Sequence, residues 1–222
     1  MLLGGMRVDK EQLLRELIDT GVIAVIRTKS GAELVKICGA LVLGGIKGVE
    51  ITMTSPGAID AIREASEILR GKAIIGAGSV LDSETARSVI LAGADFVVGP
   101  VVNFDLIRTC KRYGKVVIPG AFSPTEILQA WEAGADVVKV FPATRLGPSF
   151  IKDVLGPLPQ VKLTPTGGIN LENLGEFLKA GAVFVGAGTA LVNRQLVADE
   201  NWEGLTKRAA EFVEAARLAR AK

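Results

Sequence analysis

The sequence predicts an α/β fold, specifically a (β/α)8 TIM barrel with an extra helix before the first strand. Eight short apolar runs alternate with amphipathic segments along the 222 residues. Most of these runs are rich in Val and Ile and apolar at successive positions, as expected for parallel strands covered on both faces. A barrel of eight strand–helix units commonly needs about 200–250 residues, so we expect a single domain over residues 1–222.

The expected strands leave room for a helix between each one and the next. They are Val22–Ile26, Val49–Ile51, Ala73–Ala77, Asp95–Val98, Val116–Pro119, Val137–Phe141, Lys162–Pro165 and Val183–Ala187. Helical spacing of apolar residues occurs at Glu33–Leu43, Ile59–Leu69, Glu84–Leu91, Phe104–Tyr113, Thr125–Trp131 and Leu171–Leu178. The alternative is an open doubly wound sheet, which usually has fewer strands and a nucleotide-binding fingerprint near its start. No such fingerprint follows Ile26.

Local signals mark where helices begin and end. Ser83 and the pair Ser123-Pro124 are typical of helix starts, because serine caps free N–H groups and proline suits the first turn. Three Ala-Gly-Ala segments precede expected strands, and their glycines supply the left-handed conformation that ends a helix. These glycines are Gly93, Gly134 and Gly181.

Two more helices are expected at the ends of the chain. Asp9–Asp19 has four aliphatic residues on one side, so it should close the bottom of the barrel. The last helix should run from Trp202 to about Leu218, and residues 1–6 should fray.

Composition excludes several classes of function. Lys and Arg number 26 against 24 Asp and Glu, so a net charge of +2 gives no electrostatic reason to expect nucleic acid or acidic membranes as partners. The chain has no histidine, which removes Ser-His and Cys-His nucleophile pairs and the commonest metal ligand. Cys38 and Cys110 match no zinc or redox spacing. With no apolar run of 18 residues and no signal peptide, a reduced, cytoplasmic protein is expected.

Lys139 is the first candidate catalytic residue. It lies within the apolar run Val137–Phe141, where strand alternation places it on the same face as Phe141 and directs it into the barrel. Burial disfavours a charged ammonium, and a neutral amine can attack a carbonyl to form a Schiff base. A structural ion pair is the alternative, but the cost of burying a lysine in so apolar a strand favours the functional interpretation.

Two more charged residues are candidates: Glu50 lies within the second expected strand, and Arg27 lies at the end of the first. By the same alternation, Glu50 and Thr52 face inward, and a carboxylate near a reactive amine could shuttle protons. An ion pair between Glu50 and Lys139 or Arg27 is an equally good interpretation. Arg27 ends the first expected strand, where a guanidinium can grip a carboxylate through two hydrogen bonds. A solvated surface arginine would explain that position as well.

Two glycine-rich turns follow the seventh and eighth expected strands. One contains Thr166, Gly167 and Gly168, and the other contains Gly188 and Thr189. Barrels commonly bind phosphate in these two loops, because glycine lets backbone N–H groups approach the anion. One such turn would be weak evidence, but two at the expected positions predict a phosphate site.

The third and fourth strands add weaker signals. Gly76-Ala77-Gly78-Ser79 resembles half of a dinucleotide fingerprint, but in a barrel it should let substrate approach the backbone and Ser79. Pro100 follows the fourth strand, where it either shapes the pocket or simply ends the strand.

Taken together, these motifs resemble the bacterial 2-keto-3-deoxy-6-phosphogluconate (KDPG) and 4-hydroxy-2-oxoglutarate (KHG) aldolases nearly end to end. The matching landmarks are Val22–Arg27, Glu50-Ile51-Thr52, Ile75–Val80, Phe96–Pro100, Pro119-Gly120, Pro124-Thr125-Glu126, Lys139–Ala143, Pro165–Ile169 and Val185–Leu191. The resemblance implies a class I pyruvate aldolase on a (β/α)8 barrel, with no metal or other cofactor, assembled as a homotrimer.

By position, the resemblance implies that Lys139 is the Schiff-base lysine and Glu50 the proton-transfer residue. Ser79 falls where the family usually has a threonine near the substrate carboxylate. Pro100 and Phe141 fall at pocket-wall positions. The implied phosphate site comprises Thr166, Gly167, Gly168, Gly188 and Thr189.

The chain also departs from the family pattern. Many members have a carboxylate-binding arginine four residues after the glutamate, where this chain has Thr54. Other members carry an arginine at the end of the first strand instead, so Arg27 is expected to take that role. Gly99 replaces a common serine, and the loop 101–103 differs as well.

The implied reaction is reversible cleavage of KDPG to pyruvate and D-glyceraldehyde 3-phosphate, the aldol step of Entner–Doudoroff metabolism. Cleavage of KHG to pyruvate and glyoxylate is a further expected activity. Two alternatives stay open from sequence: a phosphosugar isomerase or epimerase on the same barrel, and a non-catalytic barrel. The isomerase or epimerase needs no lysine adduct, so borohydride trapping separates it from an aldolase. Ligand-induced stabilisation without turnover would support the non-catalytic barrel.

Overall fold

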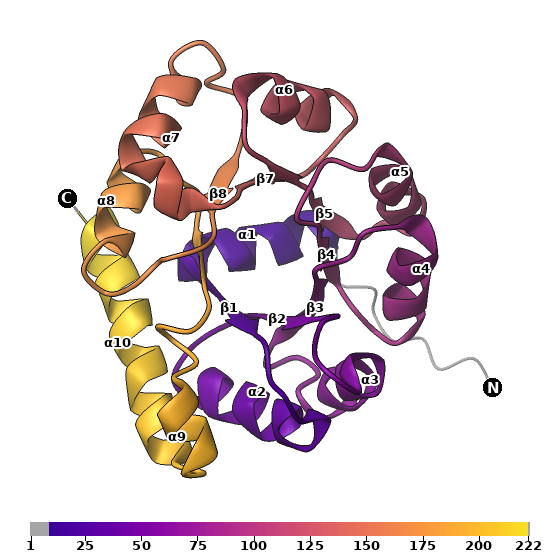
Figure 1. Ribbon diagram of the computed structural model, residues 1–222, viewed down its shortest axis with the longest axis vertical. Coiled ribbons are helices and arrows are strands. Elements are labelled where there is room, and N and C mark those ends of the chain that lie inside the picture. The colour runs from indigo at the N-terminus through magenta and orange to yellow at the C-terminus, as the bar shows by residue number, and fades with distance from the viewer. Residues whose placement is uncertain (1–8, 222) are drawn as a thin grey trace.

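Parallel strands curl about a common centre, and helices cover their outer side (Figure 1). The computed structural model describes residues 9–221, so the expected fraying of residues 1–6 lies outside this range. The strands are β1 (Val22–Ile26), β2 (Gly48–Thr52), β3 (Ile74–Gly78), β4 (Phe96–Val98), β5 (Val116–Ile118), β6 (Gly120–Ala121), β7 (Val138–Val140), β8 (Leu163–Pro165) and β9 (Val185–Ala187). Each of the eight expected runs overlaps a strand, which confirms an α/β fold with a parallel sheet.

The strands form two parallel sheets. Six strands pair in the order β5-β4-β3-β2-β1-β9, and three pair in the order β6-β7-β8. The fifth expected strand divides at Pro119, because proline has no N–H to donate to a neighbouring strand. Before Pro119 the chain pairs with β4, and after it the chain pairs with β7. At the other edge, Thr166 and Gly186 form an isolated parallel bridge next to β8 and β9.

Helices alternate with the strands along the chain. They are α1 (Lys10–Thr20), α2 (Leu34–Leu43), α3 (Ala58–Ile68), α4 (Ser83–Leu91), α5 (Phe104–Arg112), α6 (Pro124–Glu132), α7 (Gly147–Leu155), α8 (Leu174–Lys179), α9 (Arg194–Ala198) and α10 (Trp202–Arg220), with short 3-10 turns at η1 (Gly31–Glu33) and η2 (Ala143–Arg145). The sequence did not indicate α7 or α9 individually. The first begins with Gly-Pro, which is typical of a turn, and the second is too short to show a helical period.

Most expected helix boundaries are confirmed. Ser123 caps α6 in a reciprocal capping box with Glu126, and the three Ala-Gly-Ala glycines all have positive φ. The prediction for Ser83 is wrong, because it is the first residue inside α4 and the cap is Asp82. The Asp82 carboxylate accepts from the N–H of Thr85 at 2.6 Å, and a negative charge is favoured at a helix N-terminus.

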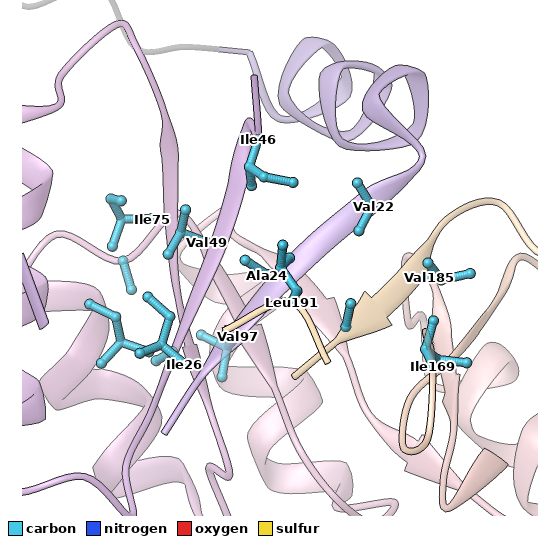
Figure 2. Close-up of a cluster of buried hydrophobic side chains, with 14 of the residues drawn as sticks. Val22, Ala24, Ile26, Ile46, Val49, Ile75, Val97, Ile169, Val185 and Leu191 are labelled. Carbon is cyan, nitrogen blue, oxygen red and sulfur yellow. The ribbon is translucent and has the colours of Figure 1, made fainter. Parts of the chain in front are cut away.

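Between the strands and the surrounding helices lies the larger hydrophobic cluster (Figure 2). Val22, Ala24 and Ile26 point outward from β1 into this layer, which agrees with a strand covered on both faces. Cys38 and Cys110 are free and buried, and burial raises the pKa of both thiols to about 12. Both cysteines therefore serve as small apolar side chains.

Helix α1 covers one end of the curled strands, as expected for Asp9–Asp19. Its Leu13 and Leu17 are buried in a second cluster with residues from the amino-terminal parts of the strands, including Phe96 and Phe184. Since the strands are parallel, their carboxyl ends all lie at the opposite end of the molecule. Within residues 9–221, no helix is both long and apolar enough to cross a membrane.

The C-terminal helix is attached to the covered end through one side chain. Arg220 donates to the carbonyl oxygens of Ile18 and Asp19 at the end of α1, and to Val183 just before β9. These bonds join the two ends of the described chain, and the Ile18 carbonyl accepts from the Gly21 N–H as well.

We expect Arg220→Ala to lower the free energy of unfolding by about 1–2 kcal/mol, since three carbonyls lose a charged donor. The matched control is Arg217→Ala, which removes only an exposed pair with Glu214 on the same helix and should cost about 0.5 kcal/mol or less. Urea unfolding at neutral pH measures both. Equal losses would contradict the role given to Arg220.

Candidate active site

A small cavity lies among the inner faces of the strands. Its polar lining comprises Glu50, Lys139, Thr164 and Thr166, and its apolar lining comprises Ile23, Val98, Ile118 and Phe184, with Gly186. The carboxylate and the lysine come from strands in different sheets, and both are buried, at 4% and 6% exposure. Sequence alternation therefore directed both residues correctly.

Lys139 lies at the centre of β7. Its Nζ lies 4.8 Å from the centroid of the Phe141 ring, which confirms that both side chains share one face. Among residues 9–221, no carboxylate oxygen lies within 4.0 Å of this amine, so the alternative of a structural ion pair is wrong. The ring carries no N–H or O–H donor that would occupy the lone pair of a neutral amine.

Glu50 is fully enclosed and close enough to two positive charges to feel them. Burial raises the pKa of the Glu50 carboxyl above its usual value, and the charges of Lys139 and then Arg27 partly oppose that rise. A Cβ added to Gly78 on the neighbouring strand would lie 1.8 Å from Glu50 Oε1. Glycine at that position therefore makes the space that the carboxyl occupies.

A cluster of hydroxyls continues from β2 toward Arg27. Thr52 Oγ1 lies 3.1 Å from Thr54 Oγ1 and 3.4 Å from Ser55 Oγ, and Ser55 Oγ accepts from the Thr28 N–H at 3.1 Å. These bonds tie the loop after β2 to the loop that carries Arg27. Among residues 9–221, no carboxylate pairs with Arg27, which is exposed at the end of β1.

Ser79 and Pro100 follow β3 and β4 at the same end. Ser79 has φ 57°, a left-handed conformation that is uncommon for a residue other than glycine. Such backbone strain concentrates at functional sites. Pro100 lies against Gly120, where an added Cβ would be 2.3 Å from the Pro100 carbonyl. Neither residue lines the cavity beside Lys139.

The first glycine turn leaves β8 with its backbone in the left-handed region. Gly167 and Gly168 have φ of 99° and 70°, which glycine adopts freely. Thr166 O accepts from the Ala143 N–H at 2.9 Å, and Gly168 O accepts from Asn173 Nδ2 at 2.9 Å. The turn is therefore held on both sides.

The second glycine turn leaves β9 alongside it. Gly186 pairs with Thr166, and a Cβ on Gly186 would lie 2.4 Å from Thr166 Oγ1, so glycine permits the two turns to meet. Gly188 and Thr189 follow immediately, and Thr189 lines a second, open hollow. The two predicted glycine turns are thus brought side by side.

A family model described as KDPG and KHG aldolase matches residues 13–208. The chain belongs to the KDPG and KHG aldolase family. The resemblance inferred from Lys139, Glu50 and the glycine turns is confirmed by this match.

Individual relatives agree with the family assignment. The 2-dehydro-3-deoxy-phosphogluconate aldolase of Haemophilus influenzae is 32% identical over 216 residues, covering 94% of this chain and 99% of the relative. The 2-dehydro-3-deoxy-6-phosphogalactonate aldolase of Escherichia coli is 34% identical over 199 residues, covering 89% and 95%. A crystal structure of KDPG aldolase from Legionella pneumophila, with pyruvate captured at low pH as a covalent carbinolamine, has a TM-score of 0.83 at 31% identity, covering 90% and 97%.

Sequence reasoning did not single out two polar residues that lie among these candidates. Ser55 has no strand alternation to place it, because it lies in the loop after β2. Thr164 lies near the end of β8, two residues before Thr166 of the glycine turn. From the sequence alone, it could belong to the turn instead of the strand. Its alternation with Thr166 was the available signal, since both should share one face.

A pH-dependent change in stability follows from the buried carboxyl. The pKa of Glu50 is higher in the native state than in the unfolded chain, so the native state binds more protons between these two pKa values. The free energy of unfolding therefore falls as pH rises above about 4.5. Glu50→Gln removes this loss. Its free energy of unfolding relative to the parent chain should therefore increase from about pH 4 to about pH 8.

The same variant should lose aldolase activity by about 100-fold or more, as expected for a group that transfers protons. Glu64→Gln, an exposed change on α3, is the control for activity. Thermal unfolding across pH, with pyruvate release as the assay, measures both effects. A stability difference that shrinks with rising pH would refute the account of Glu50.

Proposed function

We propose that this chain is a class I aldolase that reversibly cleaves KDPG to pyruvate and D-glyceraldehyde 3-phosphate through a Schiff base on Lys139. The observation that supports it best is the buried Lys139 amine, which has Glu50 lining the same cavity and no ion-paired partner among residues 9–221. The Legionella relative captured with pyruvate as a carbinolamine belongs to the same family.

The proposed chemistry uses only groups of the chain. Lys139 Nζ attacks the C2 carbonyl, and loss of water from the carbinolamine gives a protonated iminium. The C3–C4 bond then breaks as its electron pair moves to the iminium nitrogen and Glu50 removes the C4 hydroxyl proton. The aldehyde leaves, the enamine is protonated at C3, and water releases pyruvate from Lys139.

Groups at the two ends of the site would hold the substrate. Arg27 is exposed and free of a carboxylate partner within residues 9–221, which suits bidentate binding of the substrate carboxylate beside Ser79 and Thr52. The paired glycine turns would hold the phosphate through backbone N–H groups. Binding at both ends orients the scissile bond over the amine.

The hollow beside Thr189 supports a phosphorylated substrate. It is also lined by Asn193, Arg194 and Gln195. The Asn193 side chain already caps α9, and Gln195 already bonds Asp199. The guanidinium of Arg194 has no acidic partner within the described chain, so it is available to a phosphate dianion. This feature favours KDPG over unphosphorylated KHG. The relatives include both a phosphogluconate aldolase and a phosphogalactonate aldolase, so the proposed substrate class includes both configurations at C4.

We further propose that the chain forms one closed (β/α)8 domain. Two links support closure: the passage of the chain through Pro119 from one sheet to the other, and the bridge between Thr166 and Gly186. With β5 and β6 counted as one strand, the series then has eight members, each followed by helical structure.

A homotrimer is the proposed assembly. Exposed apolar side chains lie on and after the neighbouring loops that follow β3, β4 and β6. They are Leu81, Val101, Phe104 and Phe122, each between 47% and 57% exposed. Asn103 Nδ2 donates to Leu81 O, which joins two of these loops. Exposed apolar groups gathered in this way are typical of a protein interface.

The decisive test of the proposed function is reduction of the protein with sodium borohydride in the presence of pyruvate. We expect one reduced pyruvyl adduct on Lys139, located by peptide mass spectrometry. Lys139→Ala should give no adduct and no turnover while keeping its folded circular dichroism. Lys162→Ala is the control, because the Lys162 amine lies over the Trp131 ring and does not line the cavity of Lys139. Substantial activity in Lys139→Ala would exclude the Schiff-base mechanism.

We also expect Arg27→Ala to raise the KM for KDPG and the half-saturating pyruvate concentration for trapping by about tenfold, with a smaller change in kcat. Lys29→Ala, which removes an exposed cation from the same loop, should leave both values nearly unchanged. Steady-state kinetics with the two variants measures the difference. An unchanged KM in Arg27→Ala would mean that the carboxylate binds elsewhere.

A further inference from the structure

Thr164 Oγ1 is a buried side-chain oxygen that has no hydrogen-bond partner within residues 9–221. The residue is 2% exposed. Burying a hydroxyl without a partner is unfavourable, and valine has almost the same shape without that cost. The hydroxyl therefore calls for an explanation outside the packing of the strand.

The position of Thr164 supplies that explanation. It lies on β8 directly opposite Lys139 of β7 in the parallel register, so both side chains project to the same face. Both line the same cavity as Glu50. The free hydroxyl thus lies beside the stem of the reactive lysine and faces the space shared with the carboxyl.

The cavity suits one small polar molecule. It is narrow, of the size that a single water molecule needs, and its polar groups come from Glu50, Lys139, Thr164 and Thr166. A buried water makes about three hydrogen bonds, and these four groups can supply them. A substrate of six carbons is too large for this space, so the part of the site lined by Lys139 and Thr164 suits water rather than the whole substrate.

We propose that Thr164 is a positioning residue for the water that leaves and re-enters the Lys139 adduct. The inference rests on the proposed Schiff-base function. In dehydration, the C2–OH bond of the carbinolamine breaks, the leaving oxygen takes the proton of the Glu50 carboxyl, and water forms beside Thr164. In the reverse step, this water adds to the iminium carbon and returns its proton to Glu50. The hydroxyl of Thr164 holds the water oxygen in line with C2 throughout.

Two isotope exchanges of pyruvate separate this role from a packing role. Exchange of the C2 carbonyl oxygen with H₂¹⁸O requires water to leave and re-enter the adduct. Exchange of C3 hydrogens with ²H₂O requires these steps and, in addition, interconversion of the iminium with its enamine. Where this proton transfer is slower than hydration, the rate of C3 exchange depends only on the equilibrium amount of iminium. If Thr164→Val slows dehydration and hydration equally, the equilibrium amount of iminium stays the same. The oxygen exchange then falls while the C3 exchange is preserved.

We expect Thr164→Val to lower the enzyme-catalysed oxygen exchange by about tenfold, with C3 exchange changed less than about twofold. Thr164→Ser restores the hydroxyl and should restore the parent ratio of the two rates. Should the valine variant fail to fold, Thr164→Ala provides the same comparison. A role in packing alone would tilt Lys139 and lower both exchanges together.

The outcomes are distinguishable. An unchanged ratio in a folded Thr164→Val or Thr164→Ala variant, or a ratio not restored in Thr164→Ser, overturns the role of Thr164 but leaves the aldolase standing. If the parent protein catalyses neither exchange and forms no borohydride adduct, the Schiff-base function fails, and the inference fails with it.

Discussion

Burial of an amine and a carboxyl around one cavity, without a direct ion pair, is the constraint on which this structure depends. Lys139 and Glu50 come from different sheets and are both almost fully enclosed. Bringing them into contact would satisfy both charges and leave neither group reactive. Keeping them apart costs stability, and the surrounding apolar clusters must offset that cost.

Small residues make this separation possible. Gly78 leaves room for the Glu50 carboxyl, and Gly186 leaves room for Thr166 where the two ends of the strand series meet. Any side chain at these positions would overlap a polar group of the site. Glycine at these positions thus leaves space for buried polar side chains.

The two ends of the molecule divide the work of stability and chemistry. At the amino-terminal end of the strands, α1 seals an apolar layer, and Arg220 ties the last helix to it. At the carboxyl end, hydroxyls and glycines replace apolar side chains, and Ser79 adopts a strained backbone. Changes in the loops at the carboxyl end can therefore alter the substrate with little effect on the core.

The sequence by itself determined the strands, most of the helices and the inward direction of Lys139 and Glu50, because local periodicity decides which face of a strand is apolar. It also determined the family, through motifs whose order and spacing survive without a structure. Only the tertiary structure decided that Asp82 rather than Ser83 caps α4, that the fifth strand changes partner at Pro119, and that Lys139 has no carboxylate within ion-pair distance among residues 9–221. It alone placed the Thr164 hydroxyl beside Lys139. These facts depend on register and distance between segments remote in the chain, which no local pattern specifies.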